Sequence, residues 1–281
     1  MNKTINAHVH MVEVEKALKG DLKKALSQDI SIFQNLQAAI KLMDPKALLA
    51  QMDEAGIERS VLYACEAPIL YASNEYVALL CERYKGRLIG FASVDPKRRD
   101  AIKVVENAVK KLGLKGLKFH PPLQRFYPND KRFFPIYKKA DELGIPIVFH
   151  VGSTPFGSMV RLDQANPILI DEIACAFPKM KIILTHLGTL WHNESFMVVE
   201  KNPNVFIDTA AYIYEIKELL TADTVERVGA KKFIFGTDYP TSYGGNVHSM
   251  KDFVNCINGL DLPSDIKEGI FYKNFQKILG N

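Results

Sequence analysis

The stretch Lys3-Thr4-Ile5-Asn6-Ala7-His8-Val9-His10 is a short, largely apolar run that ends in two histidines one residue apart. Residues i and i+2 of an extended strand point to the same face, so both imidazoles would leave the strand end side by side. Such a pair can hold a metal ion if further ligands reach it. Two histidines at this spacing can also be an ordinary polar strand end, and the rest of the chain decides between the two interpretations.

The composition is typical of a globular protein with one sizeable core. The chain has 281 residues, 47% of them hydrophobic and 24% charged. A single α/β barrel typically has about 250 residues, so we expect one domain over 1–281. The formal net charge of +4 is spread along the chain, which argues against a nucleic-acid partner.

The cysteines and the apolar runs indicate the cellular compartment in which the protein is expected. Cys65, Cys81, Cys175 and Cys256 lie far apart without a C-x-x-C pair, so neither a disulfide framework nor a thiolate zinc site is indicated. We expect reduced, mostly buried thiols. No run approaches the ~20 apolar residues of a membrane span and no apolar leader precedes His8, so we expect a cytoplasmic protein without a membrane partner.

A long segment, residues 11–43, follows the first predicted strand. It contains two stretches with helical spacing of apolar residues, Glu13–Lys19 and Ile32–Ile40. A helical insertion at the carboxyl end of a strand is a candidate lid. It can equally be a surface helical hairpin that only packs on its neighbours.

From Asp44 onward, helices and strands alternate. The first unit is a helix over Pro45–Ala55, with Asp44 as its N-cap and Gly56 as its stop. The pattern predicts strands at 5–10, 59–64, 88–94, 116–120, 145–150, 181–186, 205–208 and 232–238. It predicts further helices at 74–84, 99–112, 130–143, 167–177, 190–200 and 215–228, and a C-terminal helix within 263–281.

This alternation predicts a parallel sheet with helices on its faces. Eight units indicate a closed (β/α)₈ TIM barrel. An open doubly wound sheet is the alternative, but no Gly-rich phosphate loop follows the first strand, which disfavours it.

Polar side chains end six of the predicted strands. The active site of such a barrel lies at the carboxyl ends of its strands, so these residues are candidates for it. They are His8 and His10, Lys118 and His120, His150, His186, Asp208, and Asp238. Five of the seven histidines belong to this set, and the other two, His192 and His248, lie in predicted loops or helix starts. Singly, each could be a hydrogen-bonded structural residue, but the barrel topology would bring them together.

Three imidazoles and a carboxylate around an open position match a catalytic Zn²⁺ or another divalent transition metal. We expect His8, His10, His150 and Asp238 to bind one ion, Zn²⁺ in the first place and Mn²⁺ as the alternative. Asp238 can also act as a general base. His186 would face the same cavity, either as a further ligand or as a general acid/base.

The chain also resembles the amidohydrolase superfamily. The resemblance rests on His8-Val-His10, Gly116-Leu-Lys-Phe-His-Pro121, Ile147-Val-Phe-His-Val-Gly152, Phe177-Pro-Lys-Met-Lys-Ile-Ile-Leu-Thr-His-Leu-Gly188, Val205-Phe-Ile-Asp-Thr209 and Phe235-Gly-Thr-Asp-Tyr-Pro240. These motifs are most similar to the branch that holds aminocarboxymuconate-semialdehyde decarboxylase, γ-resorcylate decarboxylase and pyrone-dicarboxylate lactonase. The tail Ile270–Leu279 resembles the closing helix of that branch, with Lys273 in place of a usual glycine.

The resemblance implies a metal-dependent barrel enzyme with the same four ligands and with His186 beside them. In two-metal relatives a lysine on strand four is carbamylated and bridges the ions, whereas this branch mostly uses one metal. We therefore favour Lys118 as an unmodified cation that binds substrate, with the carbamate as second choice. A buried ammonium without a partner would be too costly for a purely structural role.

Two other metal-barrel families begin with the same histidine pair. A histidinol-phosphatase-like enzyme would end with Asp-x-His, where this chain has Pro240. A TatD-like nuclease would have a glutamate ligand after strand three, where this chain has Asp95-Pro96.

The residues that would contact the substrate are less well defined. The side chain of His120 is in phase with that of Lys118 on strand four, so both would point into the barrel and could contact substrate. Arg125 and Arg161 could pair with a substrate carboxylate or could be solvated loop arginines. Trp191 and Tyr212 could be pocket walls or ordinary packing.

The leading hypothesis is hydrolysis of a small, carboxylate-bearing amide, ester or lactone through a metal-activated water. A nonoxidative decarboxylase, which would be a carbon–carbon lyase, is the alternative, and a noncatalytic metal- or metabolite-binding barrel is third. The partner would be a small molecule, and a homodimer is common in the branch that the chain resembles.

Overall fold

The computed structural model describes residues 3–18, 40–68, 70–154, 156–243 and 246–280. Eight parallel strands follow one another around a barrel in chain order. They are β1 (Ile5–His10), β2 (Arg59–Tyr63), β3 (Leu88–Ser93), β4 (Leu117–Phe119), β5 (Ile147–Phe149), β6 (Ile182–Leu184), β7 (Val205–Asp208) and β8 (Phe233–Ile234). The Ala7 amide donates to the Phe235 carbonyl (2.8 Å) and the Asp238 amide to the His8 carbonyl (3.0 Å), and these bonds join the last strand to the first. The predicted (β/α)₈ barrel is confirmed, and the open sheet is excluded.

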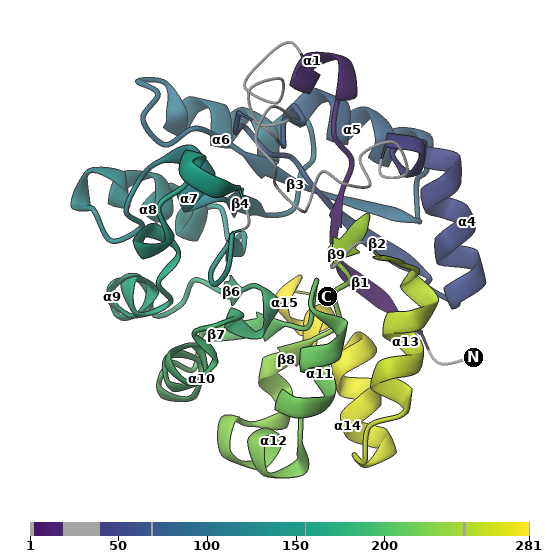
Figure 1. The fold of residues 1–281 in the computed structure, drawn as a ribbon. Coiled ribbons are helices and arrows are strands. Elements are labelled where there is room, and N and C mark those ends of the chain that lie inside the picture. Colours follow the sequence, from purple (N-terminus) through teal and green to yellow (C-terminus); the bar gives the residue numbers. More distant parts are fainter. Residues whose placement is uncertain (1–2, 19–39, 69, 155, 244–245, 281) are drawn as a thin grey trace.

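The helices form an outer ring around the strands (Figure 1). Asp44 caps the helix Pro45–Ala55 through the Lys46 amide, and Gly56 ends it with a left-handed φ of 68°, as predicted. The larger helices are α4 (Pro45–Ala55), α5 (Asn74–Arg83), α6 (Ala101–Lys110), α8 (Phe134–Glu142), α9 (Ile168–Ala176), α10 (His192–Lys201) and α13 (Met250–Asn258). Shorter ones are α1 (Val14–Leu18), α7 (Pro121–Gln124), α11 (Ile213–Leu219), α12 (Ala222–Val228), α14 (Ser264–Glu268) and α15 (Asn274–Ile278).

Two predicted helices differ in detail from the structure. The segment 215–228 forms two helices, α11 and α12, because Thr221 is extended and its side chain caps α12 through the Thr224 amide. The C-terminal helix begins at Ser264 and contains a π-helical turn, Gly269–Lys273, before α15.

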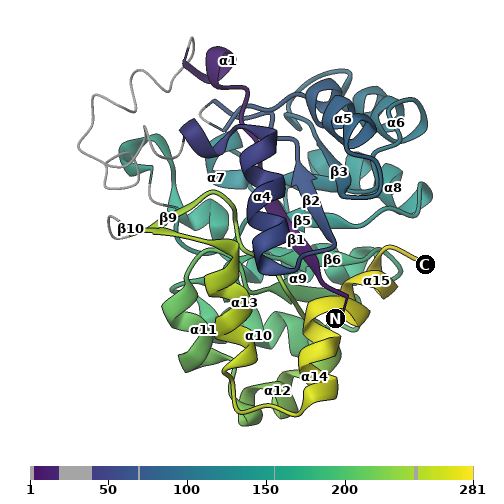
Figure 2. The same cartoon turned by 90° about the vertical axis from the view of Figure 1, so that its right-hand side faces the viewer.

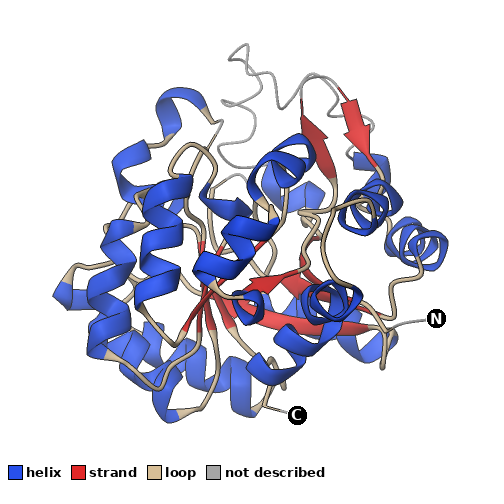
Figure 3. Ribbon diagram, turned by 90° about the horizontal axis from the view of Figure 1, so that it is seen from below, coloured by secondary structure: helices blue, strands red, loops and turns tan. Residues whose placement is uncertain are grey.

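The strands are buried on both faces, as their apolar runs predicted. Inside the barrel, a cluster that includes Val148, Ile183, Phe91 and Phe275 fills the amino-terminal end. The rings of Phe91 and Phe275 stack with their centroids 6.3 Å apart. Figure 3 shows the strands gathered in the middle and the helices around them. The polar residues that end the strands lie at the opposite, carboxyl end of the barrel.

Strand β1 contains an irregularity that the sequence did not predict. Its pairing with β2 gains one extra residue between Asn6 and Val9. A bulge of this kind changes the phase of a strand and re-aims its side chains. Ile5 and Ala7 belong to the interior cluster, and the rings of His8, within the bulge, and His10, after it, also contact the interior residue Tyr63.

The insertion after β1 is described only in part. The expected helix Glu13–Lys19 is found as α1, whereas the expected helix Ile32–Ile40 lies, except for Ile40, outside the described residues. The Glu13 carboxylate accepts hydrogen bonds from the Ser73 amide (2.8 Å) and hydroxyl (2.6 Å), which anchors the start of the insertion to the N-cap of α5. The lid remains a prediction.

A short antiparallel hairpin, β9 (Thr241–Tyr243) and β10 (Asn246–His248), follows the eighth strand. Both termini lie on the side of the barrel away from it (Figure 2). His248 is part of the hairpin and His192 begins α10, so neither ends a barrel strand. Among the described helices, none is long and apolar enough to cross a membrane.

Candidate metal centre

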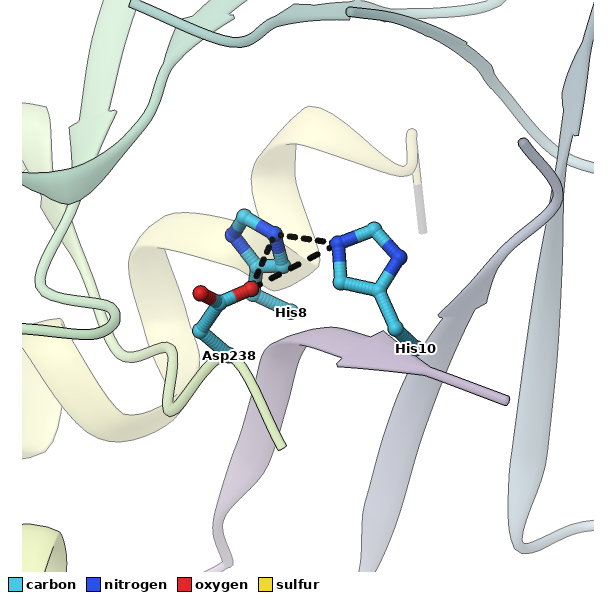
Figure 4. Close-up of side chains that lie close together, drawn as sticks. All are labelled: His8, His10 and Asp238. Atoms are coloured by element: carbon cyan, nitrogen blue, oxygen red, sulfur yellow. Dashed lines mark hydrogen bonds and ion pairs between the residues drawn. The ribbon is translucent and has the colours of Figure 1, made fainter. Parts of the chain in front are cut away.

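Three of the predicted ligands converge at the carboxyl end of the barrel (Figure 4). His8 Nε2 lies 3.2 Å from His10 Nε2 and 3.1 Å from Asp238 Oδ1, and His10 Nε2 lies 3.4 Å from the same oxygen. Nitrogen and oxygen ligands sit about 2.0–2.2 Å from zinc, which places neighbouring ligand atoms roughly 3 Å apart. The spacing and the chemistry of this triangle of His8, His10 and Asp238 therefore fit a divalent transition metal.

The backbone supports this convergence. Asp238 adopts a left-handed φ of 62°, a sparsely populated conformation for a non-glycine residue. Its amide is held by the His8 carbonyl at 3.0 Å. The loop after β8 is thus fastened to β1, which supplies the two histidines.

The charges of the triangle suit metal binding. Burial lowers the pKa of His10 to about 3, although Asp238 opposes the shift. Burial would raise the pKa of Asp238, but His8, with His186 and His10, holds it well below its usual range. At neutral pH His10 is therefore a neutral imidazole and Asp238 a carboxylate, and both are the forms that bind metals.

Asp208, at the end of β7, lies behind His8. Its carboxylate is buried, and Oδ2 lies 2.8 Å from His8 Nδ1. Burial would lower the pKa of His8, but the carboxylates of Asp208 and Asp238 raise it overall, against the opposing charge of Lys118. Asp208 was expected at a strand end, but its sequence context indicated no role for it.

His150 does not point a free nitrogen at the triangle. Its Nδ1 lies 3.1 Å from His186 Nε2, and its Nε2 lies 2.8 Å from Thr154 Oγ1. Its ring stacks on His120 with centroids 3.9 Å apart and an interplanar angle of 9°. To become the fourth ligand, His150 would have to give up one of these hydrogen bonds, a constraint that the spacing of the sequence does not reveal.

His186 borders the triangle instead of completing it. Its ring centroid is 5.0 Å from that of His8, and together with His8 and Asp208 it forms a second close group of possible ligand atoms. In that group Asp208 Oδ2 is already engaged by His8 Nδ1. Burial lowers the pKa of His186 to about 4, so its imidazole is neutral at pH 7.

Lys118 is the most unusual group of the site. Its side chain is fully buried, and Nζ has no hydrogen-bond partner among the described residues. The ammonium lies 4.9 Å from the ring centroid of Tyr63, within the range of a cation–π contact. Burial lowers the pKa of Lys118 to about 8, while Asp208 and Asp238 act in the opposite direction. An anion placed beside Nζ would satisfy a cation that the protein leaves without a hydrogen bond.

The other residues that were predicted to bind substrate range from buried to exposed. His120 is buried and caps α7, with Nδ1 3.5 Å from the Leu123 amide. Arg125 is exposed at the end of α7. Arg161 is also exposed, and its contacts are an ion pair with Asp163 (2.7 Å) and the ring of Tyr127. Trp191 is half-buried before α10.

Two aromatic residues border the histidines. The buried Tyr212 ring is 6.4 Å from His186. Tyr63, which sequence analysis missed, lies under His8 with ring centroids 4.7 Å apart, and its hydroxyl donates to the Ala7 carbonyl at 2.5 Å. Its place in the apolar run of β2 gave no signal of this role.

A small apolar cluster lies beside the polar site. Its buried members come from α1, α7 and the segments after β2 and β5, and they are Ala17, Cys65, Ala67, Leu123 and Phe156. The Phe156 ring is 6.4 Å from that of His120. At the carboxyl end of the barrel, charged and polar side chains therefore lie next to an apolar cluster, a combination that is usual in small-molecule sites.

Comparison with known proteins shows the family to which the chain belongs. The family model described as amidohydrolase matches residues 5–280. Among curated proteins, the chain is similar to 2-keto-4-carboxy-3-hexenedioate hydratase of Sphingobium sp. (strain NBRC 103272 / SYK-6), with 24% identity over 252 residues, 75% of this chain and 71% of the relative.

Solved structures share the fold along the whole chain. A dihydroxybenzoic acid decarboxylase from Polaromonas sp. JS666, with bound manganese and 2-nitroresorcinol, superposes with a TM-score of 0.75 at 18% identity and covers 100% of this chain and 97% of that one. A probable 2-pyrone-4,6-dicarboxylic acid hydrolase from Acinetobacter baumannii, with citric acid bound, gives a TM-score of 0.71 at 13% identity with 100% of both chains covered. The chain belongs to the amidohydrolase family of metal-dependent enzymes.

Proposed function

We propose that this protein is a metal-dependent hydrolase of a small, carboxylate-bearing amide, ester or lactone. The observation that carries the proposal is the triangle of His8 Nε2, His10 Nε2 and Asp238 Oδ1, with separations of 3.1 to 3.4 Å. His8, His10 and Asp238 would hold one ion, with His150 as the fourth ligand after a change of its hydrogen bonds. We propose Zn²⁺ for this ion, with Mn²⁺ as the alternative. When bound, the ion would act as a Lewis acid on a substrate carbonyl and would lower the pKa of water.

Other residues of the chain would bind the substrate. Lys118, which has no hydrogen-bond partner among the described residues, would bind a carboxylate or another anionic oxygen of the substrate. The apolar cluster around Leu123 and Phe156 would cover the hydrocarbon part of the substrate and exclude water from it.

Proton transfer would fall to Asp238 and His186. Asp238 is ionised and can accept a proton from the attacking water. The proton that Asp238 accepts can then pass to the leaving group by way of His186, whose imidazole is neutral at pH 7 and can take up this proton before donating it.

A decarboxylase is the second candidate. It is favoured by the decarboxylase structure that covers the whole chain and by the place of Lys118, which could hold a substrate carboxylate next to the histidines. The similarity to a hydratase adds the addition of water to a double bond as a further outcome of the same assay. All four predicted ligand residues are present and three of them form the triangle, so nothing in the described part of the chain favours a noncatalytic barrel.

The test is to assay metal-loaded protein in H₂¹⁸O against a panel of lactones, esters, amides, carboxylated phenols and unsaturated dicarboxylates. Hydrolysis would place ¹⁸O in a new carboxylate, decarboxylation would release CO₂ without ¹⁸O in the organic product, and hydration would place ¹⁸O in an alcohol. His248→Ala is a matched control, because His248 lies in the β9–β10 hairpin, outside the metal triangle. Turnover of lactones or esters that is lost on chelation supports the proposal. Metal-dependent CO₂ release without hydrolysis would replace it with the second candidate.

A further inference from the structure

We propose that Asp208 is a positioning residue whose two carboxylate oxygens have separate tasks, one for the metal ligand His8 and one for the loop that carries His186. The inference rests on the proposed metal site. It goes beyond that site because Asp208 need not touch metal or substrate to act.

The geometry assigns each oxygen its own donors. Oδ2 faces His8 Nδ1 at 2.8 Å. Oδ1 accepts the backbone amides of His186 (2.7 Å) and Ala210 (3.1 Å). The side chain is buried, so water does not compete for these positions.

The contact through Oδ2 fixes which nitrogen of His8 carries a proton. A carboxylate can only accept, so His8 Nδ1 must be the N–H donor. The lone pair of Nε2 is then free to point at the metal position between His10 and Asp238. Without an acceptor at Nδ1, the proton could move to Nε2 and occupy that position.

The contacts through Oδ1 hold a strained turn. His186 and Leu187 have left-handed φ values of 62° and 48°, which are costly for residues with a side chain. The hydrogen bond of the His186 amide to Oδ1 fixes the entrance of this turn. One carboxylate therefore determines the protonated nitrogen of His8 and the backbone position of His186, and the two rings have centroids 5.0 Å apart.

The substitution Asp208→Asn separates the two tasks. Two backbone N–H groups require an oxygen at the Oδ1 position, so the new amide must place its NH₂ toward His8. That NH₂ donates, and it forces His8 to accept at Nδ1 and to carry its proton on Nε2. The backbone contacts are kept while the metal ligand is blocked. Loss of such a partner of a metal-binding histidine typically weakens metal binding about 10–100-fold.

The experiment compares Zn²⁺ affinity, by competition with a chelator, among wild type, Asp208→Asn and Asp171→Asn. Asp171 is the control because its carboxylate also accepts hydrogen bonds, from Lys201 and Asn202, but lies in α9, away from the carboxyl end of the barrel. We expect affinity to fall about 10–100-fold in Asp208→Asn only. Affinity within twofold of wild type in that variant would overturn the inference.

A second measurement does not depend on the folding of any variant. In ¹⁵N-labelled, zinc-loaded wild type, NMR should show His8 protonated at Nδ1 and unprotonated at Nε2. Coordination through Nδ1, with the proton on Nε2, would refute the role of Asp208. If wild type binds neither zinc nor manganese, the proposed function fails instead, so the two failures are distinguishable.

Discussion

The two ends of the barrel are equally buried but chemically opposite. At the amino-terminal end, Phe91 and Phe275 fill the interior with hydrocarbon. At the carboxyl end, His8, Lys118 and Asp208 are 0% exposed, just as Phe91 and Phe275 are. Burial of hydrocarbon stabilises a fold, whereas burial of charge costs free energy unless a partner offsets it. The comparison indicates that one end maintains the fold and the other binds something from outside the chain.

The largest effect is expected at the polar end. Asp238→Asn should lower kcat about 10²–10⁴-fold, because it weakens a metal ligand and removes the base. The unfolding free energy of the metal-free protein should fall as well, because His8, His186 and His10 stabilise the ionised carboxylate that the substitution removes. Steady-state kinetics and denaturant unfolding of the same preparation check both statements, and an unchanged kcat would remove Asp238 from the mechanism.

At the apolar end, a substitution is expected to change stability without changing kcat. Phe275→Ala should destabilise the protein by about 3–5 kcal/mol, because it leaves a cavity under the barrel. The kcat of the molecules that remain folded should equal that of wild type. A specific loss of kcat at full folding would show that the two ends are not independent.

Lys118 allows the sharpest comparison. Lys118→Met keeps the length of the side chain and removes the buried charge, so we expect a gain in stability of about 1–3 kcal/mol. The same change should raise KM by about 10–100-fold, through loss of a charged hydrogen bond to the substrate. A loss of stability would mean that Lys118 has a structural role after all.

The pH dependence of wild type gives an independent check on Lys118. Its pKa is lowered from 10.5 to about 8, so the ammonium is lost as the pH rises through 8. We expect kcat/KM for an anionic substrate to fall above this pH. Because the unfolded chain binds the proton more tightly, stability should rise between pH 8 and 10.5, and both trends should be absent in Lys118→Met.

The smallest effect is expected at Arg161. The sequence left two alternatives for this residue, a partner of a substrate carboxylate or a solvated loop arginine, and in the structure it is exposed and paired with Asp163. Arg161→Ala should leave stability unchanged, because exposed ion pairs contribute little, and should change KM by less than about threefold. A tenfold rise in KM would support the first alternative, in which Arg161 pairs with a substrate carboxylate.

Much of the fold could be predicted from the sequence because its signals are local. The spacing of apolar residues and the caps Asp44 and Gly56 located all eight strands and most helices. The polar strand ends likewise predicted that His8, His10 and Asp238 would meet.

The remaining features depend on contacts between distant parts of the chain. The bulge in β1 follows from pairing with β2, and the orientation of His150 from Thr154 and His186. The task of Asp208 requires its distance to a residue 200 positions away. Local patterns do not encode these contacts. The sequence therefore predicted which side chains would lie near one another, but not the hydrogen bonds between them.

The most direct test is elemental analysis of purified wild type, His10→Ala and His248→Ala. The central claim predicts about one equivalent of zinc or manganese in wild type and in His248→Ala, and a loss of it in His10→Ala. Two equivalents would revive a carbamylated Lys118 that bridges two ions. No metal in wild type, even after reloading, would contradict the claim that the triangle of His8, His10 and Asp238 is a metal site.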